Sequence, residues 1–107
     1  MREAEIEKYL VKRVAEHDGV AEKFVSPGCK NKPDRIVSWP ARAWAMGPLY
    51  AMPRVHFVEV KTLLGKVTIG QKRDHERRRK MGFVVVVVRS KADVDTYIKR
   101  YAPPRTV

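Results

Sequence analysis

The sequence predicts an α/β fold in which a mixed β-sheet is flanked by helices. One reason is the run FVVVVV at residues 83–88, which is continuously apolar and β-branched, as in a central strand buried on both faces. A second reason is that segments with helical spacing or helix-capping residues alternate with strand-like segments. The expected order of elements is α-β-β-β-α-β-α, with no internal repeat.

Three helices are expected, near both ends of the chain and before the last strand. Ile6, Leu10 and Val14 recur at i, i+4 and i+8, which is the spacing of one helical face. Thr68 and Ser90 are placed to cap the second and third helices. The expected bounds are residues 3–17 with Gly19 as the stop, 69–81 with Gly82 as the stop, and a last helix after Ser90 whose apolar face includes Val94, Tyr97, Ile98 and Tyr101.

Three further strands are expected at residues 20–25, 34–38 and 55–61. Residues 39–54, between the second and third of these, contain both tryptophans, three prolines and two methionines. Proline continues neither a central strand nor a helix, so this segment is expected to form an inserted loop or an irregular hairpin. The 107 residues are expected to form one domain around this insert.

The charge of the chain restricts its partners. Lys and Arg total 23 against 12 Asp and Glu, which gives a net charge of +11 and a pI near 10.2. That imbalance favours a polyanion, usually nucleic acid, and the alternatives are an anionic membrane surface and solubility alone. No run of about 18 apolar residues occurs, so no membrane-spanning segment is expected. A single cysteine excludes an intramolecular disulfide and fits a reducing cytoplasm.

Charged residues interrupt the strand expected at residues 55–61. Glu59 and Lys61 share one face of it, about 7 Å apart, because side chains alternate and each residue rises roughly 3.3 Å. Asp34 begins the preceding strand, so the two acids converge if these strands are neighbours. Two carboxylates, main-chain carbonyls and water are ligands that Mg²⁺ accepts, and such an ion polarises a phosphoryl oxygen and lowers the pKa of water. A lysine beside it can orient that water or offset charge at phosphorus.

Five motifs follow one another over nearly the whole chain, from Glu3 to about Val94. They read EAEIEKYLVKRVAEHDG, AEKF, PDRIV, FVEVKTLLGKVTIGQ and GFVVVVVRS. Together they resemble the VRR-NUC family of structure-specific nucleases, in the PD-(D/E)XK superfamily. The resemblance implies a restriction-endonuclease-like core and an endonuclease that hydrolyses DNA phosphodiester bonds with Mg²⁺ or Mn²⁺ and no small-molecule cofactor.

The resemblance also implies roles for residues of the expected strands. Asp34 and Glu59 would be metal ligands, with the carbonyl oxygen of Val60 as a third. Lys61 would be the catalytic lysine. The stretch between Asp34 and Glu59 is longer than in compact members of the family, because of the insert at residues 39–54.

Two helical positions complete the implied catalytic set. Glu3 matches the acid of the first helix, and Glu7, one turn later, is the competing choice. Gln71 matches a glutamine that approaches the site from the second helix. The spacing from Thr68 to Gln71 also predicts a capping box, so both interpretations of Gln71 stay open.

A basic surface is expected beside the site. Arg73, Arg77 and Lys80 recur at i, i+4 and i+7, for which a solvated helix face is the alternative interpretation. His75 lies one helical turn after Gln71 and is expected to face DNA or the rim of the site. The residues expected to contact nucleic acid are Lys23, Lys30, Lys32, Arg35, Arg73, His75, Arg77 and Lys80.

The expected substrate is branched DNA, with a four-way junction first, by analogy with small junction resolvases. A symmetric homodimer is expected, with Trp39, Trp44 and Met46 available for its interface. Two other functions stay open: a non-catalytic DNA-binding module and a sequence-specific restriction-type endonuclease. The small size is typical of phage or bacterial members, which would act in the bacterial or phage-infected cytoplasm.

Overall fold

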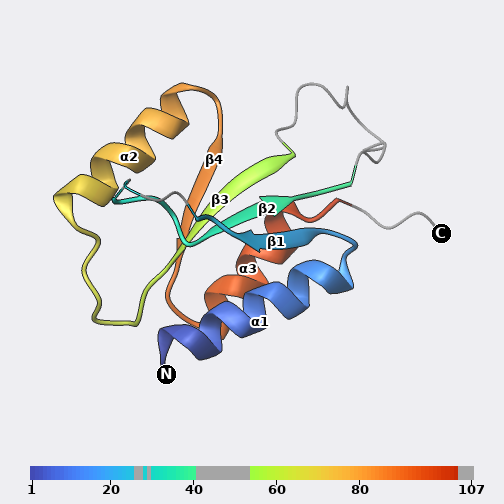
Figure 1. The fold of residues 1–107 in the computed structure, drawn as a ribbon. Helices are drawn as coiled ribbons and strands as arrows, with labels where there is room; N and C mark the ends of the chain where they lie inside the picture. The colour runs from blue at the N-terminus through green and yellow to red at the C-terminus, as the bar shows by residue number, and fades with distance from the viewer. Residues whose placement is uncertain (26–27, 29, 41–53, 104–107) are drawn as a thin grey trace.

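The structure is a computed structural model that describes residues 1–25, 28, 30–40 and 54–103, and its elements follow the predicted order (Figure 1). The α/β prediction is therefore confirmed. The elements are α1 (Glu3–Glu16), β1 (Val20–Lys23), β2 (Arg35–Ser38), β3 (Val55–Val60), α2 (Ile69–Lys80), β4 (Val84–Val88) and α3 (Lys91–Tyr101). No helix among the described residues is long and apolar enough to cross a membrane.

The four strands form one mixed sheet in the order β1-β2-β3-β4. The first two pairings are antiparallel, whereas β3 and β4 are parallel and α2 forms the connection between them. Arg35 lies opposite Val58 in the register of β2 and β3. Asp34, one residue earlier, therefore comes level with Glu59, so the neighbouring strands that the site required are present.

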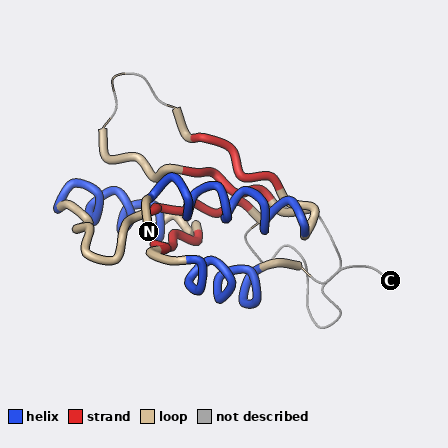
Figure 2. The backbone as a smooth tube through the Cα atoms, turned by 90° about the horizontal axis from the view of Figure 1, so that it is seen from below, coloured by secondary structure: helices blue, strands red, loops and turns tan. Residues whose placement is uncertain are grey.

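The two faces of β3 contact different helices. Val58 and Val60 belong to the apolar core with residues of α1 and α3, including Leu10 and Val94. Seen from below, α1 overlaps the strands and extends in much the same direction (Figure 2). Glu59 points to the opposite face, where it meets α2. Alternation along one strand thus separates the apolar core from the candidate site.

The prediction that β4 is a central strand is wrong. Its five valines predicted a central strand, but β4 ends the described sheet and pairs there with β3 alone. Val85 and Val88 are buried, whereas the other three valines are only half-buried. Composition reports how apolar the surroundings of a strand are, and it does not report how many strands flank it.

The end of α1 also differs from the prediction. The helix ends at Glu16, and Asp18, with φ of 64°, takes the left-handed conformation that Gly19 was expected to supply. Gly19 has another role, because a side chain there would come within 2.6 Å of the Trp39 ring. The other helix and strand ends lie within two residues of their expected positions.

Trp39 lies in the core, which contradicts its predicted place in a dimer interface. Only 5% of it is exposed, and its indole nitrogen donates to Nδ1 of His56 and to the hydroxyl of Tyr97, each at 3.2 Å. Its main-chain N–H donates to the carbonyl of Arg54 at 2.9 Å, so β2 and β3 stay paired up to the edges of the insert. Trp44 and Met46 lie outside the described residues.

Candidate active site

Asp34 and Glu59 lie together between the start of β2 and the end of β3. Glu59 is only 2% exposed, and its carboxyl group is hydrogen-bonded to that of Asp34. The main chain of β3 also binds Asp34, because Oδ2 of Asp34 accepts a hydrogen bond from the N–H of Val60 at 2.7 Å. We expected Asp34 and Glu59 to converge if their strands were neighbours, and in the fold they do.

The carbonyl oxygen of Val60 lies on the Asp34 side of β3. The N–H of Lys61 donates to Val88 in β4 at 3.0 Å, so residue 61 directs its main-chain polar groups toward β4. Successive residues of a strand direct these groups to opposite edges, and the N–H and C=O of one residue point the same way. Since the Val60 N–H points to Asp34, its carbonyl oxygen does too.

Burial and a like charge keep Glu59 protonated near neutral pH. Loss of solvation, the hydrogen bond with Asp34 and the charge of Asp34 raise the pKa of Glu59 to about 8. Lys61 lowers this pKa, and Glu3 raises it. Because Glu59 is buried against a second carboxyl group, a proton or a cation shared between the two acids stabilises them.

The first helix offers two acids, and they have different surroundings. Glu7 is bound to Arg35, whose Nε donates to Oε1 of Glu7 at 2.7 Å. Glu3, at the start of α1, is close enough to Glu59 for its charge to raise the pKa of that residue.

His75 lies in the interior, so its predicted contact with nucleic acid is wrong. His75 is 2% exposed, and its Nε2 lies 3.4 Å from Oε1 of Glu59. Burial and the neighbouring Arg79 lower the pKa of His75. Near neutral pH both partners are uncharged, so the contact is a hydrogen bond between neutral groups and not an ion pair. The sequence signal for this contact was the position of His75 one turn after Gln71.

Gln71 forms the capping box that the sequence offered as one interpretation. Its main-chain N–H donates to Oγ1 of Thr68 at 3.1 Å, and its Oε1 accepts from the N–H of Thr68 at 2.9 Å. The cap occupies the amide oxygen. The amide nitrogen is the atom of Gln71 that a role in the site would use.

The second helix is held to the sheet by charged side chains, which the sequence did not reveal. Its buried residues are Asp74, His75 and Arg78. The Arg78 guanidinium lies 4.5 Å from the ring centroid of Phe57 and 5.1 Å from that of Phe24, and its Nε donates to Asp74 at 2.8 Å. Burial raises the pKa of Asp74, but the hydrogen bond and charge of Arg78, together with the charges of Lys32 and Arg77, outweigh burial and lower this pKa. These contacts fix the helix that brings His75 to Glu59.

Some of the expected nucleic-acid contacts are already engaged within the protein. Arg35 binds Glu7 and also donates to the carbonyl of Ala21 at 3.2 Å. Lys32 lies 3.8 Å from Asp74. Arg77 also bonds to Asp74, at 2.7 Å, although 63% of its side chain remains exposed. The expected contacts that lie on the surface are Lys23, Lys30, Arg73, Arg77 and Lys80.

Two basic hollows lie on this side of the molecule, and one of them adjoins the paired acids. One, of about 410 Å³, reaches Asp34, and the other, of about 440 Å³, lies over α1 and β1. They share Glu7 and Lys23. The first is lined by Glu7, Lys23, Phe24, Val25, Lys32, Pro33 and Asp34, and the second by Ala4, Glu7, Lys8, Val11, Lys12, Lys23 and Arg35.

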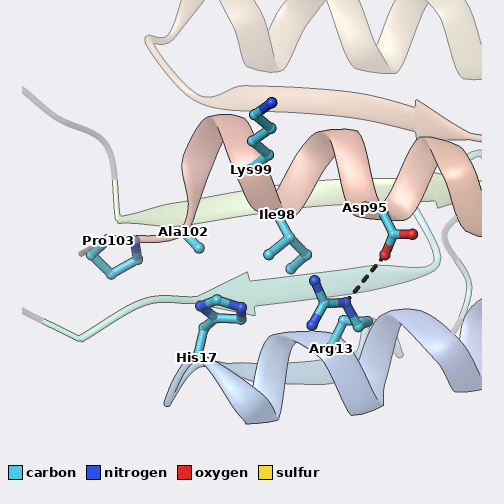
Figure 3. Close-up of a pocket in the computed structure, with 7 residues that line it drawn as sticks. All are labelled: Arg13, His17, Asp95, Ile98, Lys99, Ala102 and Pro103. Carbon is cyan, nitrogen blue, oxygen red and sulfur yellow. Dashed lines mark hydrogen bonds and ion pairs between the residues drawn. The ribbon is translucent and has the colours of Figure 1, made fainter. Parts of the chain in front are cut away.

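A third hollow, of about 290 Å³, lies between α1 and α3 and is separate from the paired acids (Figure 3). Arg13 and Asp95 line this hollow and form an ion pair, with Nε and Oδ1 3.2 Å apart. This ion pair joins the two helices, so the hollow is explained by helix packing.

The donor groups fit a hard divalent cation. In the part of the chain that the structure describes, no group of three or more His, Cys, Asp or Glu residues is arranged to hold a metal. Asp34 and Glu59 nevertheless supply two carboxyl groups, and Val60 supplies a main-chain oxygen beside them. Oxygen ligands of this kind suit Mg²⁺ or Mn²⁺, and Mg²⁺ commonly keeps several waters.

Comparison with known proteins identifies the family. No family model matches the chain. It is 39% identical over 90 residues to "Putative nuclease p44" of Acyrthosiphon pisum secondary endosymbiont phage 1, covering 84% of this chain and 85% of that protein. A solved structure described as "VRR_NUC domain" superposes with a TM-score of 0.73 and 33% identity, over 92% of this chain and 96% of the other. The chain therefore belongs to the VRR-NUC family of nucleases.

Proposed function

We propose that this protein is a Mg²⁺- or Mn²⁺-dependent DNA endonuclease that acts in the cytoplasm of a bacterium or of a phage-infected host. The observation that carries the proposal is the buried Glu59 carboxyl group against Asp34, with a pKa of about 8. A protein that only binds DNA gains nothing from two acids held where phosphate must approach. A divalent cation between them would replace the shared proton and remove the cost of their proximity.

The side chains around the acids have distinct tasks in this proposal. Asp34, Glu59 and the Val60 carbonyl would hold the cation, which supplies the charge that activates water and stabilises the phosphoryl oxygens. Lys61 would orient the attacking water and balance negative charge on phosphorus. Glu3 would accept hydrogen bonds from water in the site.

DNA would lie along the basic hollows beside Asp34. Lys23 lines both hollows, and Lys32 lines the one that reaches Asp34. Arg73, Arg77 and Lys80 would hold phosphates on the other side, from exposed positions on α2. Such contacts position a duplex without reading its sequence, which favours recognition of DNA shape over recognition of fixed sites.

Branched DNA cut by a symmetric homodimer is the form of this activity that we favour. A 107-residue domain offers little surface for holding a junction by itself. The β4 edge supports the dimer, because within the described residues this valine-rich strand pairs on one side only. Exposed edges of this kind are usually covered by another chain or another element.

A cleavage panel tests the proposal. Labelled four-way junction, flap, splayed and linear DNA of shared sequence would be incubated with Mg²⁺ or with EDTA. We expect metal-dependent products, most rapidly from the junction. Asp34→Asn should abolish them, whereas Glu76→Gln, which alters an exposed acid of α2, should cut like the parent.

The alternatives predict different products from the same panel. Binding that is insensitive to EDTA and gives no products with any substrate would identify a non-catalytic module and contradict the proposal. Cuts at fixed sites in linear duplex would identify a restriction-type enzyme. Light scattering of the purified protein tests the dimer, and a monomeric mass at concentrations that support cleavage would contradict it.

A further inference from the structure

Two leucines protrude from the turn that directly follows Lys61. The N–H of Gly65 donates to the carbonyl of Thr62 at 3.1 Å, which places Leu63 and Leu64 at the two central positions of a β-turn. Leu63 is 76% exposed and Leu64 is 89% exposed. Central turn positions usually carry Gly, Pro, Asn, Asp or Ser, so two solvent-exposed leucines at these positions are unusual and point to a function.

Arg89, at the end of β4, holds this turn in shape. Its Nη1 donates to the carbonyl of Thr62 at 2.9 Å and also to the carbonyl of Gly65. Asp93 anchors the main chain of Arg89, accepting its N–H at 2.9 Å. The leucines are thus presented on a braced turn, which lowers the entropy lost when a partner covers them.

The surroundings of the turn match a polyanion. From residue 60 to residue 73 the chain contains four lysine or arginine residues and no aspartate or glutamate. The connection from β3 to α2 extends away from the sheet, at the end where α1 begins (Figures 1 and 2). It therefore lies on the side of the molecule that carries Glu3 and Lys61.

We propose that Leu63 and Leu64 contact nucleobases where the stacking of the bound DNA is interrupted. This inference rests on the proposed function. Continuous duplex offers phosphates but hides its base faces, whereas a branch point or a duplex end exposes both. An apolar wedge framed by cations complements that combination, and leucine inserts between bases in other DNA-bending proteins. The turn would then supply the preference for branched over linear DNA that phosphate contacts lack.

The test measures binding without hydrolysis. The protein would be titrated in Ca²⁺ into a four-way junction and into a linear duplex. Each DNA carries 2-aminopurine at the same sequence position, and in the junction this position is the branch point. We expect the parent to raise the fluorescence of the junction, because a base that loses stacking becomes brighter. Leu63→Ser/Leu64→Ser should bind the junction about tenfold more weakly, since the apolar contact with the unstacked bases is lost. Its affinity for linear duplex should stay within about twofold.

Matched variants isolate the wedge. Leu63→Met/Leu64→Met keeps the turn apolar and should retain the signal, and Met81→Ser removes an apolar side chain that is 60% exposed elsewhere and should have no effect. Circular dichroism checks that each variant is folded. Equal junction affinity and equal fluorescence for the parent and the serine variant would overturn the proposal.

Other partners of the leucines give other results. Binding of the parent, but not of the serine variant, to vesicles of phosphatidylglycerol and phosphatidylcholine, with junction binding unchanged, would assign the turn to a membrane. A change of oligomeric mass with junction binding unchanged would assign it to self-association. Cleavage in Mg²⁺ is scored separately: loss of junction preference with cleavage retained supports the wedge, while a parent that binds junctions but never cuts contradicts only the proposed activity.

Discussion

Glu59→Gln should stabilise the metal-free protein while abolishing its activity. The glutamine keeps the size of the side chain and its hydrogen-bonding capacity toward Asp34 and His75, but it carries no charge to lose. The native glutamic acid is 2% exposed and its pKa is raised to about 8. Folding therefore opposes ionisation of Glu59, and this opposition is what the substitution removes.

The size of the effect follows from linkage between protonation and folding. In the unfolded chain Glu59 ionises with its ordinary pKa of 4.5, whereas in the folded protein its pKa is about 8. Below pH 4.5 Glu59 is protonated in both the folded and the unfolded protein, so its ionisation does not lower the free energy of unfolding. As the pH rises, stability falls by about 1.36 kcal/mol for each pH unit, reaching roughly 3 kcal/mol at pH 7 and roughly 5 kcal/mol above pH 8. Glutamine should recover that loss.

Thermal and urea unfolding in EDTA, at pH 5, 7 and 8.5, measure the difference in stability between the parent and Glu59→Gln. For a domain of 107 residues, roughly 3 kcal/mol raises Tm by on the order of 10 °C at pH 7. The gain should be small at pH 5 and largest at pH 8.5, and excess Mg²⁺ should narrow it by stabilising the parent. The exposed control Glu76→Gln should change stability by less than about 0.5 kcal/mol. A Glu59→Gln gain that is absent at pH 7, or equal at all three pH values, would refute the reasoning.

Three further predictions concern other side chains of the site. Lys61→Met should slow single-turnover cleavage by about a hundredfold or more, while junction affinity in Ca²⁺ changes less than about threefold; a parallel loss of affinity would mean that Lys61 only binds DNA. His75→Ala should weaken Mn²⁺ binding by about tenfold in calorimetry and His75→Gln should restore most of it, because the hydrogen bond to Glu59 orients the carboxyl group. Arg78→Met should lower the free energy of unfolding by about 2 kcal/mol in urea, since buried Asp74 loses one charged hydrogen bond and keeps only Arg77 and Lys32 as partners; an unchanged midpoint would contradict that role.

The order of elements could be predicted from the sequence because its signals are local. Apolar spacing in Ile6, Leu10 and Val14, and the cap at Thr68, specify their helices through neighbours one or two turns away. Side-chain alternation along one strand likewise places His56 on the face opposite Glu59, where His56 is buried against Tyr97.

The site was predictable only in part, because its geometry depends on pairing between distant segments. Alternation placed Glu59 and Lys61 on one face, but only the register of β2 on β3 brings Asp34 level with Glu59. The different surroundings of Glu3 and Glu7 likewise depend on a third segment, because Arg35 of β2 binds Glu7 of α1.

The sequence by itself determined the order of helices and strands, the apolar core and the acids available for a metal, because propensity, capping and alternation act over a few residues. Only the tertiary structure decided that His75 and Arg78 face the interior, that β4 ends the described sheet and that Gly19 makes room for a tryptophan ring. These positions depend on contacts with residues from distant parts of the chain, and strand pairing and helix packing bring those residues together.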